Sequence, residues 1–268
     1  MQLSVAIMCK DNEATIGRTL DSVAGLADEI VAMDSGSTDG TLGLLERAGA
    51  RVVSTPWLGY VATRQKSIEA CRGEWVLVLD SDESVLPALA DSITEAMTNP
   101  GDRSGFEVNR KIFYRDRALN FAWQPEWRLR LVRRGLYRVA GLNPHDYIEP
   151  IRKTERIGRL SGDLRHDAIC DWSSFLARQI RHARTSAAAV HADGRRGSRL
   201  RLLTSPSGAF LKQLVLKQAW RDGTPGWIAA GSVAIGGLAK QSILLELGME
   251  EASEVQMSNP TTTPPRPR

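Results

Sequence analysis

Residues 75–84, WVLVLDSDES, run from a continuous apolar stretch directly into a cluster of carboxylate side chains. The apolar positions 75–79 predict a strand that is covered on both faces, because neighbouring strand positions point to opposite faces. Asp80, Asp82 and Glu83 follow at its end. Carboxylates this close repel one another unless water or a cation relieves the repulsion. The stretch therefore predicts a buried strand ending at a divalent-metal site, with a solvated turn as the alternative.

The hundred residues around this strand alternate short apolar runs with helical periodicity. We expect strands at 3–8, 29–33, 51–54 and 75–79, and helices from about 12 to 23, after 40, from 61 to 71 and from 86 to 97. This alternation predicts a parallel α/β sheet flanked by helices, with right-handed crossovers. In such a sheet, ligands bind beyond the carboxyl ends of the strands. The polar clusters at 9–13, 34–40 and 80–83 are therefore expected along one edge.

The composition is that of an ordinary soluble protein. The chain has 268 residues, 42% of them hydrophobic and 25% charged, which suits one large domain or a domain with a smaller appendage. Cys9, Cys71 and Cys170 are odd in number and far apart, so we expect free core cysteines in a reducing compartment. No secretory signal is expected. The uncharged stretch 223–239 is short and glycine-rich, and we expect it to be a poor membrane span.

Charge is distributed unevenly along the chain. Residues 1–100 carry 7 Lys and Arg against 15 Asp and Glu, whereas residues 152–222 carry 15 against 6. In the basic part the pattern is helical, and Trp220 and Trp227 accompany the arginines, which suits attachment to an anionic membrane surface. A helical cap with a solvated basic face is the alternative, and no recognised nucleic-acid motif accompanies the charges. We expect a catalytic domain over 1–170, a helical appendage over 171–250 and a disordered tail over 251–268.

Residues 34–40, DSGSTDG, have two interpretations. Ser, Gly, Thr and Asp are typical of any tight turn between a strand and a helix, where Asp39 would cap the following helix. Asp34, however, stands at the end of the strand, where a carboxylate can accept a hydrogen bond from the N–H of a base such as uracil. Both a turn and a nucleotide contact remain open for this segment.

Four segments together resemble the nucleotide-sugar glycosyltransferases of family 2: LSVAIMCKDNEATIGRTLDSV (3–23), DEIVAMDSGSTDGT (28–41), RQKSIEACRGEWVLVLDSDE (64–83) and EWRLRLVRRG (126–135). The resemblance covers roughly residues 1–250 and is strongest to the branch that adds glucose to the inner core of bacterial lipopolysaccharide. It implies a GT-A fold, in which a Rossmann-like, mostly parallel sheet binds a UDP-sugar together with Mn²⁺ or Mg²⁺. It also implies inversion at the anomeric carbon. We expect transfer of a hexose to a glycan or lipid-linked acceptor by a cytoplasmic protein peripheral to the cell membrane.

The resemblance further implies which residues contact the nucleotide. Asp34 corresponds to the carboxylate that binds the base, and Glu13 and Lys66 correspond to nucleotide contacts. Asp80 opens the DxD pair, where it would hold the ribose or metal-bound water. Ser81 lies inside the pair and within the nucleotide-sugar site, at a position where the branch commonly has alanine.

The same resemblance implies a metal site. Asp82 completes the DxD pair and would hold the cation, together with Asp80. His166 lies where related enzymes supply a third metal ligand, and His145 is the substitute candidate. A histidine taken singly is more often a hydrogen-bonded structural residue, which is the alternative for both.

The expected reaction also needs a base. Breaking the bond between sugar C1 and diphosphate leaves charge on the phosphate, which a metal neutralises, so a carboxylate is expected to take the proton of the acceptor hydroxyl. Asp146 and Glu126 are the candidates. In the family the base follows an arginine-bearing strand and a turn, which favours Asp146, although the branch usually has Glu there. Either carboxylate could instead pair with the arginines at 128–134.

Two other functions compete with glycosyl transfer. A sugar nucleotidyltransferase uses a similar sheet and paired acids, but it carries a glycine-rich loop after the first strand to hold a triphosphate, and residues 8–20 lack one. A nucleotide-sugar-binding protein without turnover is the non-catalytic alternative. The presence of both DxD acids and of a candidate base argues against it.

Overall fold

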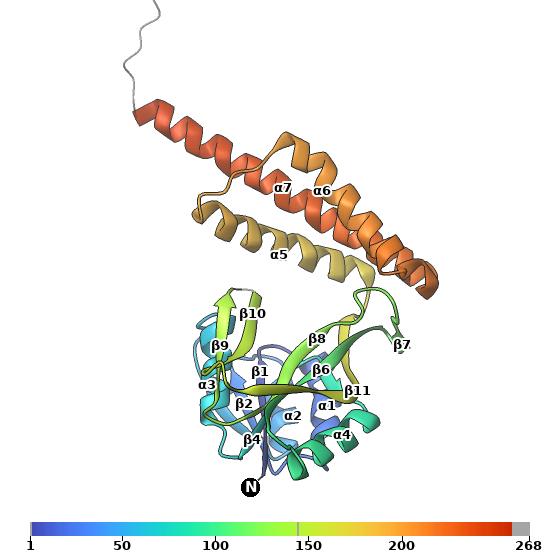
Figure 1. Ribbon diagram of the computed structural model, residues 1–268. Coiled ribbons are helices and arrows are strands. Elements are labelled where there is room, and N and C mark those ends of the chain that lie inside the picture. The colour runs from blue at the N-terminus through green and yellow to red at the C-terminus, as the bar shows by residue number, and fades with distance from the viewer. Residues whose placement is uncertain (1, 144, 259–268) are drawn as a thin grey trace, which may run out of the picture. The chain divides into compact units, whose positions relative to one another are not determined.

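The computed structural model describes residues 2–143 and 145–258 (Figure 1). The chain divides into two compact units, one ending at Asp171 and the other beginning at Trp172. The first unit holds the large sheet and the second is entirely helical in its described part. We describe each unit by itself.

The first half of the N-terminal unit alternates strands and helices as the sequence predicts. In chain order the elements are β1 (Leu3–Cys9), α1 (Glu13–Val23), β2 (Glu29–Asp34), α2 (Thr41–Arg47), β3 (Arg51–Ser54), α3 (Tyr60–Ala70), β4 (Trp75–Asp80) and α4 (Pro87–Thr98). The strands run parallel in the order β3-β2-β1-β4. This order brings the ends of β2 and β4 to either side of the end of β1, which confirms the predicted α/β sheet.

The second half of the unit extends the same sheet with strands of mixed direction. Its strands are β5 (Glu83–Val85), β6 (Arg103–Tyr114), β7 (Arg117–Ala118), β8 (Trp127–Arg133) and β11 (Arg156–Ile169). β8 pairs antiparallel with β4, and the sheet continues through β6 and β11 to β5. β9 (Tyr137–Leu142) and β10 (His145–Pro150) form a separate antiparallel pair. β6 and β8 carry Arg110 and Arg130 to the end of β4, where both side chains face Asp80.

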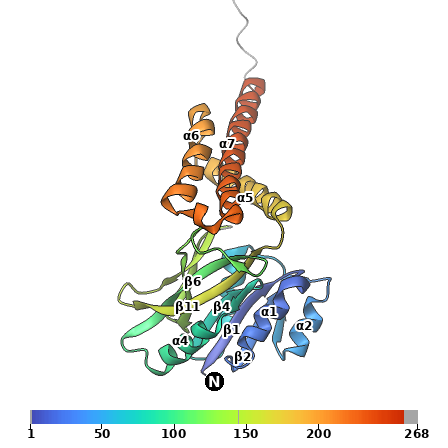
Figure 2. The same cartoon turned by 90° about the vertical axis from the view of Figure 1, so that its right-hand side faces the viewer.

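Burial on both faces explains the continuous apolar pattern of the central strands. Val5 and Leu77 pack on the face that α1, α2 and α4 cover (Figure 2), whereas Ala6 and Val76 pack on the other face with Ile68 of α3. Alternate residues of one strand thus enter different cores.

The cysteines are free, as predicted, but they do not all lie in the core. Cys9 and Cys71 are buried, and burial raises the pKa of each thiol to about 12. Cys170 is exposed, so the predicted core position is wrong for this residue. It follows the end of β11, where the chain leaves the sheet.

The C-terminal unit contains three main helices joined by tight turns. They are α5 (Trp172–Ala192), α6 (Arg199–Leu211) and α7 (Thr224–Ser258), and α6 is followed by a π-helical turn over Lys212–Leu216 and a 3₁₀ turn over Ala219–Asp222. α5 and α6 both pack along α7 (Figure 1). The stretch 251–258, expected to be disordered, belongs to α7, and residues 259–268 lie outside the described part of the chain.

α7 also differs from the expectation for residues 223–239. The helix continues through Lys240, so its segment Thr224–Glu251 reaches 28 residues and contains an 18-residue window with a mean hydropathy of 1.5. By length and composition alone this segment could cross a membrane, and 22% of its apolar window is buried within the protein.

Candidate active site

Parallel pairing brings the three polar clusters to one edge of the sheet. Cys9 at the end of β1 lies opposite Asp34 of β2, and Met8 lies opposite Asp80 of β4. The loops that follow are joined by hydrogen bonds: the backbone N–H of Thr38 donates to Asp11 at 2.7 Å. The edge predicted from the sequence therefore exists and carries Asp34 and Asp80 on either side of β1.

Asp34 and Glu13 both hold the loop after β2 in place. The buried Asp34 carboxylate accepts the backbone N–H of Gly36 at 3.0 Å and the hydroxyl of Ser37 at 2.5 Å. Glu13 accepts the backbone N–H of Gly40 at 3.1 Å. Both residues lie at the edge where the nucleotide is expected, and both also serve the turn that was the alternative interpretation.

Asp80 is surrounded by guanidinium groups. Its Oδ1 lies 2.7 Å from Nη2 of Arg64, and its Oδ2 lies 2.9 Å from Arg130 and 3.8 Å from Arg110. Burial alone would raise the pKa of Asp80, but the three arginines, led by Arg64, hold it well below its usual range. Asp80 is therefore a fixed anion whose two oxygens both face cations.

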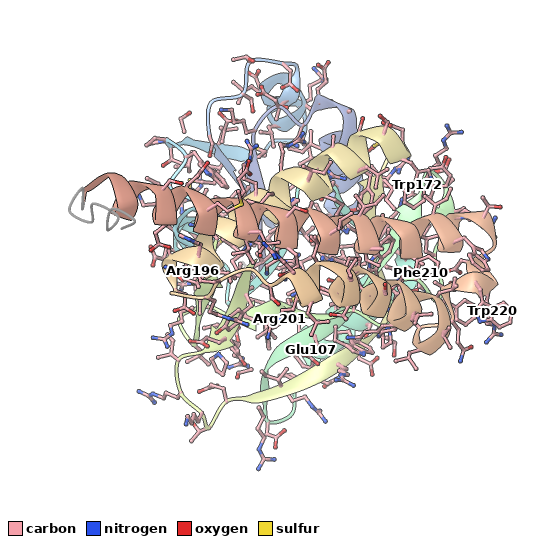
Figure 3. All side chains as sticks on the ribbon, turned by 90° about the horizontal axis from the view of Figure 1, so that it is seen from above. Glu107, Trp172, Arg196, Arg201, Phe210 and Trp220 are labelled. Carbon is pink, nitrogen blue, oxygen red and sulfur yellow. The ribbon has the colours of Figure 1, made fainter. Side chains whose placement is uncertain are left out.

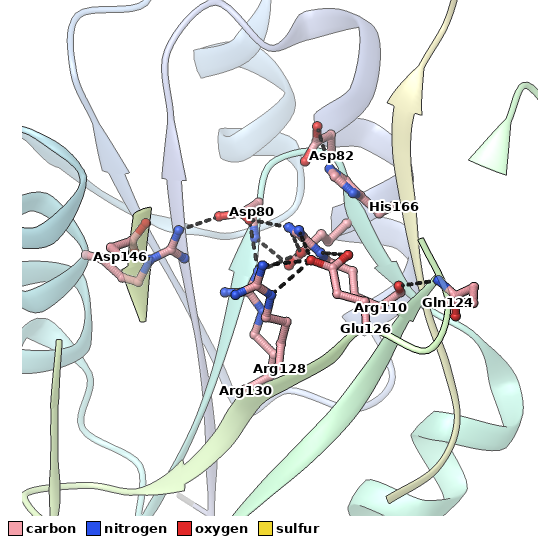
Figure 4. A network of polar contacts seen from close by, with 11 residues as sticks. Asp80, Asp82, Arg110, Gln124, Glu126, Arg128, Arg130, Asp146 and His166 are labelled. Carbon is pink, nitrogen blue, oxygen red and sulfur yellow. Dashed lines mark hydrogen bonds and ion pairs between the residues drawn. The ribbon is translucent and has the colours of Figure 1, made fainter. Parts of the chain in front are cut away.

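These contacts belong to a larger ionic cluster (Figure 4). The cluster consists of four carboxylates, from Asp80, Glu83, Glu126 and Asp146, and four guanidinium groups, from Arg64, Arg110, Arg128 and Arg130. Glu83 is fully buried and accepts the backbone N–H of Asp80 at 3.0 Å and a guanidinium N–H of Arg130 at 2.6 Å. Glu83 thus fixes the backbone at the start of the DSDE turn.

Asp82 points away from this cluster toward His166. Nε2 of His166 on β11 lies 3.4 Å from Oδ2 of Asp82. Burial alone would lower the pKa of His166, but the Asp82 carboxylate raises it above its usual value. Ser81, between the two acids, is buried, and its carbonyl accepts the hydroxyl of Thr19 at 3.1 Å.

Asp82 and His166 fit a cation that shares its coordination with a substrate. Within residues 2–143 and 145–258, no group of three His, Cys, Asp or Glu side chains gathers at metal-binding distances. Mg²⁺ sites commonly use one or two carboxylates and complete their coordination with substrate phosphates and water. Oδ2 of Asp82 and Nε2 of His166, which lie 3.4 Å apart, are close enough to share one cation. The side chain of His145 lies outside the described part of the chain.

The two candidate bases have different surroundings. Glu126 forms ion pairs with Arg110 and Arg128, each of which places a guanidinium nitrogen 2.7 Å from Oε1. Burial alone would raise the pKa of Glu126, but the two arginines lower it below its usual value. Asp146 on β10 is bonded through Oδ2 to Nε of Arg64. Arg64 therefore joins Asp146 directly to Asp80, whereas Glu126 is held in a clamp of two arginines.

Arg64 is a site residue that the sequence did not single out. Arg64 and Lys66 both belong to α3, but residues two apart lie on nearly opposite sides of a helix. The Arg64 side chain is 5% exposed and reaches Asp80 and Asp146, whereas Lys66 is exposed. The signal that could have identified Arg64 is its position among the buried residues Thr63, Ser67 and Ile68 of the same helix.

Comparisons with known proteins identify the family of the chain. The profile of the family described as "Glycosyl transferase family 2" matches residues 4–153, which is more than half of the chain and includes all four carboxylates of the ionic cluster. The chain belongs to glycosyl transferase family 2. The family assignment confirms the resemblance read from the sequence.

Individual relatives match most of the chain. A lipopolysaccharide core biosynthesis glycosyltransferase, LpsC of Rhizobium meliloti, is 29% identical over 247 residues, or 88% of each chain. An uncharacterized glycosyltransferase of Rickettsia typhi is 25% identical over 96% of this chain and 91% of its own. Among solved structures, glucosyl-3-phosphoglycerate synthase of Mycobacterium tuberculosis with Mn²⁺, UDP-glucose and phosphoglyceric acid shares 30% identity over 43% of this chain and 44% of that one, with a TM-score of 0.35.

Proposed function

We propose that this family 2 glycosyltransferase moves a hexose such as glucose from a UDP-sugar to a lipopolysaccharide-core type of glycan or lipid-linked acceptor, with inversion at the anomeric carbon. The similarity to LpsC over 88% of each chain supports the acceptor class. The site geometry supports a reaction at the carboxyl ends of β1, β2 and β4, where the nucleotide would meet Glu13, Asp34, Asp80 and Ser81. Lys66 on the exposed side of α3 completes the proposed nucleotide contacts.

The observation that carries the proposal is the bridge that Arg64 forms between Asp80 and Asp146. Inverting transfer requires a base on the face of the sugar opposite to the departing diphosphate. Asp80 belongs to the donor half of the proposed site, and a single buried guanidinium group keeps Asp146 next to it. Asp146 is therefore the proposed base, and it accepts the proton of the acceptor hydroxyl.

The other charged residues prepare the site for the developing charge. Mn²⁺ or Mg²⁺, held by Asp82 and His166, would neutralise the charge on the departing diphosphate. Arg64, Arg110 and Arg130 keep Asp80 ionised and fixed before the substrate arrives. Groups that are already oriented need no reorganisation during the reaction, which is the main electrostatic contribution to catalysis.

We also propose that the protein is cytoplasmic and binds the inner face of the cell membrane through the helical unit. Supporting this, residues 172–245 carry 11 Lys and Arg against 2 Asp and Glu. Trp220 and Trp227 are both about half exposed, and aromatic rings of this kind favour the membrane interface. A lipid-linked acceptor would be found at that surface.

A screen of UDP-sugars tests the catalytic proposal. We expect release of UDP with one hexose donor in the presence of Mn²⁺ or Mg²⁺ and an acceptor extract, and a product whose anomeric configuration is inverted by NMR. Pyrophosphate release from a nucleoside triphosphate would instead indicate a nucleotidyltransferase. Tight UDP-sugar binding without turnover for every donor and acceptor would support the non-catalytic alternative.

A further inference from the structure

A cavity in the helical unit is lined mainly by cationic side chains. Its volume is about 80 Å³, whereas a single water needs only about 10–15 Å³ of such space, so it has room for a group of several heavy atoms. Figure 3 labels Arg196 and Arg201 beside α7. The lining residues are Val190, Arg195, Arg196, Arg201, Lys240, Gln241 and Leu244.

Two glycines allow the chain to form the walls of this cavity. Gly194, with φ of +79°, ends α5, and its N–H donates to the carbonyl of His191 at 2.9 Å. Gly197 allows the next turn to approach α7 closely. Any larger residue would be excluded there, because its Cβ would lie 2.7 Å from the backbone nitrogen of Leu245. Arg196 is fixed by donating Nη1–H to the His191 carbonyl at 3.0 Å. The sequence GRRG therefore places Arg195 and Arg196 against α7 in a defined way.

The charge around the cavity is strongly unbalanced. Arg196 pairs with Glu251 at 2.8 Å. Among the side chains that the structure describes, no carboxylate forms an ion pair with Arg195, Arg201 or Lys240. Cations gathered around one cavity repel each other, and an anion bound between them relieves that repulsion.

Two further observations favour an anion that also carries a hydroxyl group. Arg199 and Arg201 lie in the first turn of α6, where the partial positive charge of the helix terminus disfavours cations unless an anion is bound. Oε1 of Gln241 is buried and has no hydrogen-bond partner in the described part of the chain. An unpaired amide oxygen needs an O–H or N–H donor, which a phosphate monoester or an adjacent alcohol group supplies.

We propose that the cavity lined by Arg195, Arg196, Arg201 and Lys240 is a binding site for a phosphate ester, carried either by a lipid headgroup or by a soluble molecule. Arginine suits this ligand because its planar fork donates two parallel hydrogen bonds to phosphate oxygens. The cavity belongs to the helical unit, whereas the proposed donor site belongs to the N-terminal unit.

Binding by the full-length protein tests the proposal in two arms at constant ionic strength. The first measures inorganic phosphate and pyrophosphate by calorimetry. The second measures flotation with phosphatidylcholine vesicles, alone or with phosphatidic acid. The test variant is Arg201→Gln/Lys240→Gln, and Arg181→Gln/Arg184→Gln on α5 removes the same charge elsewhere in the unit. Arg201→Lys keeps the charge, and unfolding midpoints check that all variants fold.

We expect the cavity variant to lose about tenfold in affinity, because charge-assisted hydrogen bonds are removed, while the α5 control changes little. Arg201→Lys keeps the charge but loses the planar fork, so its affinity should fall less than that of the cavity variant. A loss confined to phosphatidic acid vesicles identifies a lipid headgroup as the source. A loss confined to the soluble arm identifies a soluble phosphate. Equal losses in the cavity variant and the α5 control, or no loss in either arm, would overturn the proposal.

Discussion

At the residue scale, the two candidate bases differ in how their oxygens are engaged. Glu126 is clamped by Arg110 and Arg128, whereas the described bond of Asp146 runs through one oxygen to Arg64. We predict that Asp146→Asn lowers transfer by about 10²–10⁴-fold, the usual contribution of a positioned base. Glu126→Gln should be much milder, because its charge orients arginines. The measurement is the transfer rate at saturating donor, with UDP affinity alongside. A dead Glu126→Gln enzyme beside an active Asp146→Asn enzyme would reverse the assignment.

A second prediction at this scale concerns the metal. Asp82→Asn removes the carboxylate beside His166, so we expect metal-dependent turnover to be lost and Mn²⁺ binding in the presence of UDP to weaken. The unfolding midpoint should change little, because Asp82 lies outside the Asp80 cluster. Asp91→Asn, an exposed change on α4, is the charge-matched control. Near-normal activity of Asp82→Asn with Mn²⁺ present would show that the cation is held elsewhere.

At the element scale, β11 approaches α4 so closely that only glycine fits at one position. Gly162 has φ of +84°, and a Cβ there would meet the backbone nitrogen of Leu89 and lie 2.8 Å from the carbonyl carbon of Ala88. Gly135 has nearly the same φ, +82°, with open space around it. Both alanine variants should lose about 1–2 kcal/mol from the left-handed backbone.

We therefore expect the Gly162→Ala variant to be less stable than the Gly135→Ala variant by about 1 kcal/mol, because β11 must move away from α4 to make room for the added methyl group. Denaturant unfolding of both variants measures the difference. Equal destabilisation of the two variants would show that β11 and α4 can move apart without a loss of folding stability.

A second prediction at the element scale concerns pH. Glu29 on β2 links its strand to both neighbours. It accepts hydrogen bonds from the hydroxyl of Ser4 on β1 at 2.6 Å and from a guanidinium N–H of Arg51 on β3 at 2.9 Å. It also accepts the backbone N–H of Arg72 at 3.0 Å. Burial alone would raise the pKa of Glu29, but these bonds lower it below its usual value. Its stabilising effect is therefore fully present above about pH 4.3, the ordinary pKa of Glu, and is lost as pH falls through the lower folded value.

We expect Glu29→Gln to lose about 1.5–3 kcal/mol of stability at pH 7, the range for hydrogen bonds to a charged group. The deficit relative to the unmodified protein should shrink as pH falls below about 4. Unfolding midpoints from about pH 3 to about pH 8, a span that brackets the ordinary pKa of Glu, measure this. A deficit that is constant over the whole range would show that the carboxylate charge of Glu29 plays no part.

At the scale of the whole molecule, an acidic N-terminal unit is joined to a basic helical one. Exposed apolar residues accompany the basic charge, among them Leu203 on α6 and Leu216 in the π-helical turn, 72% and 76% exposed. We predict that the protein floats with phosphatidylglycerol vesicles at low salt and that raised salt releases it, because salt screens exposed charges over about 8 Å at physiological ionic strength.

Leu203→Ser/Leu216→Ser should weaken that flotation, while Leu42→Ser, a similarly apolar change in α2, should not. Equal flotation with neutral and anionic vesicles at low salt would remove the electrostatic part of the proposal. Retention at high salt and alkaline pH would indicate instead that α7 spans the bilayer.

Much of the α/β half could be predicted from the sequence because its signals are local. Apolar runs such as 3–8 and 75–79 and the turn chemistry between them depend on neighbouring residues, and the predicted elements match β1, β4 and their neighbours. The mixed strands from β6 to β11 were harder to predict, because each pairs with partners far away in the chain. Cys170 and the stretch 251–258 were assigned from composition alone, and composition does not report packing.

For the site, the sequence by itself determined the acids at the ends of the strands, because the alternating pattern predicts parallel strands, whose carboxyl ends bring Asp34, Asp80 and Asp82 to one edge. Only the tertiary structure decided which cations meet them. Arg64 lies on α3 and Asp146 on β10, 82 positions apart, and their contact depends on how the two elements fold against β4. The energy of an ion pair depends on the distance between the two charges in space, and the sequence gives only their separation along the chain.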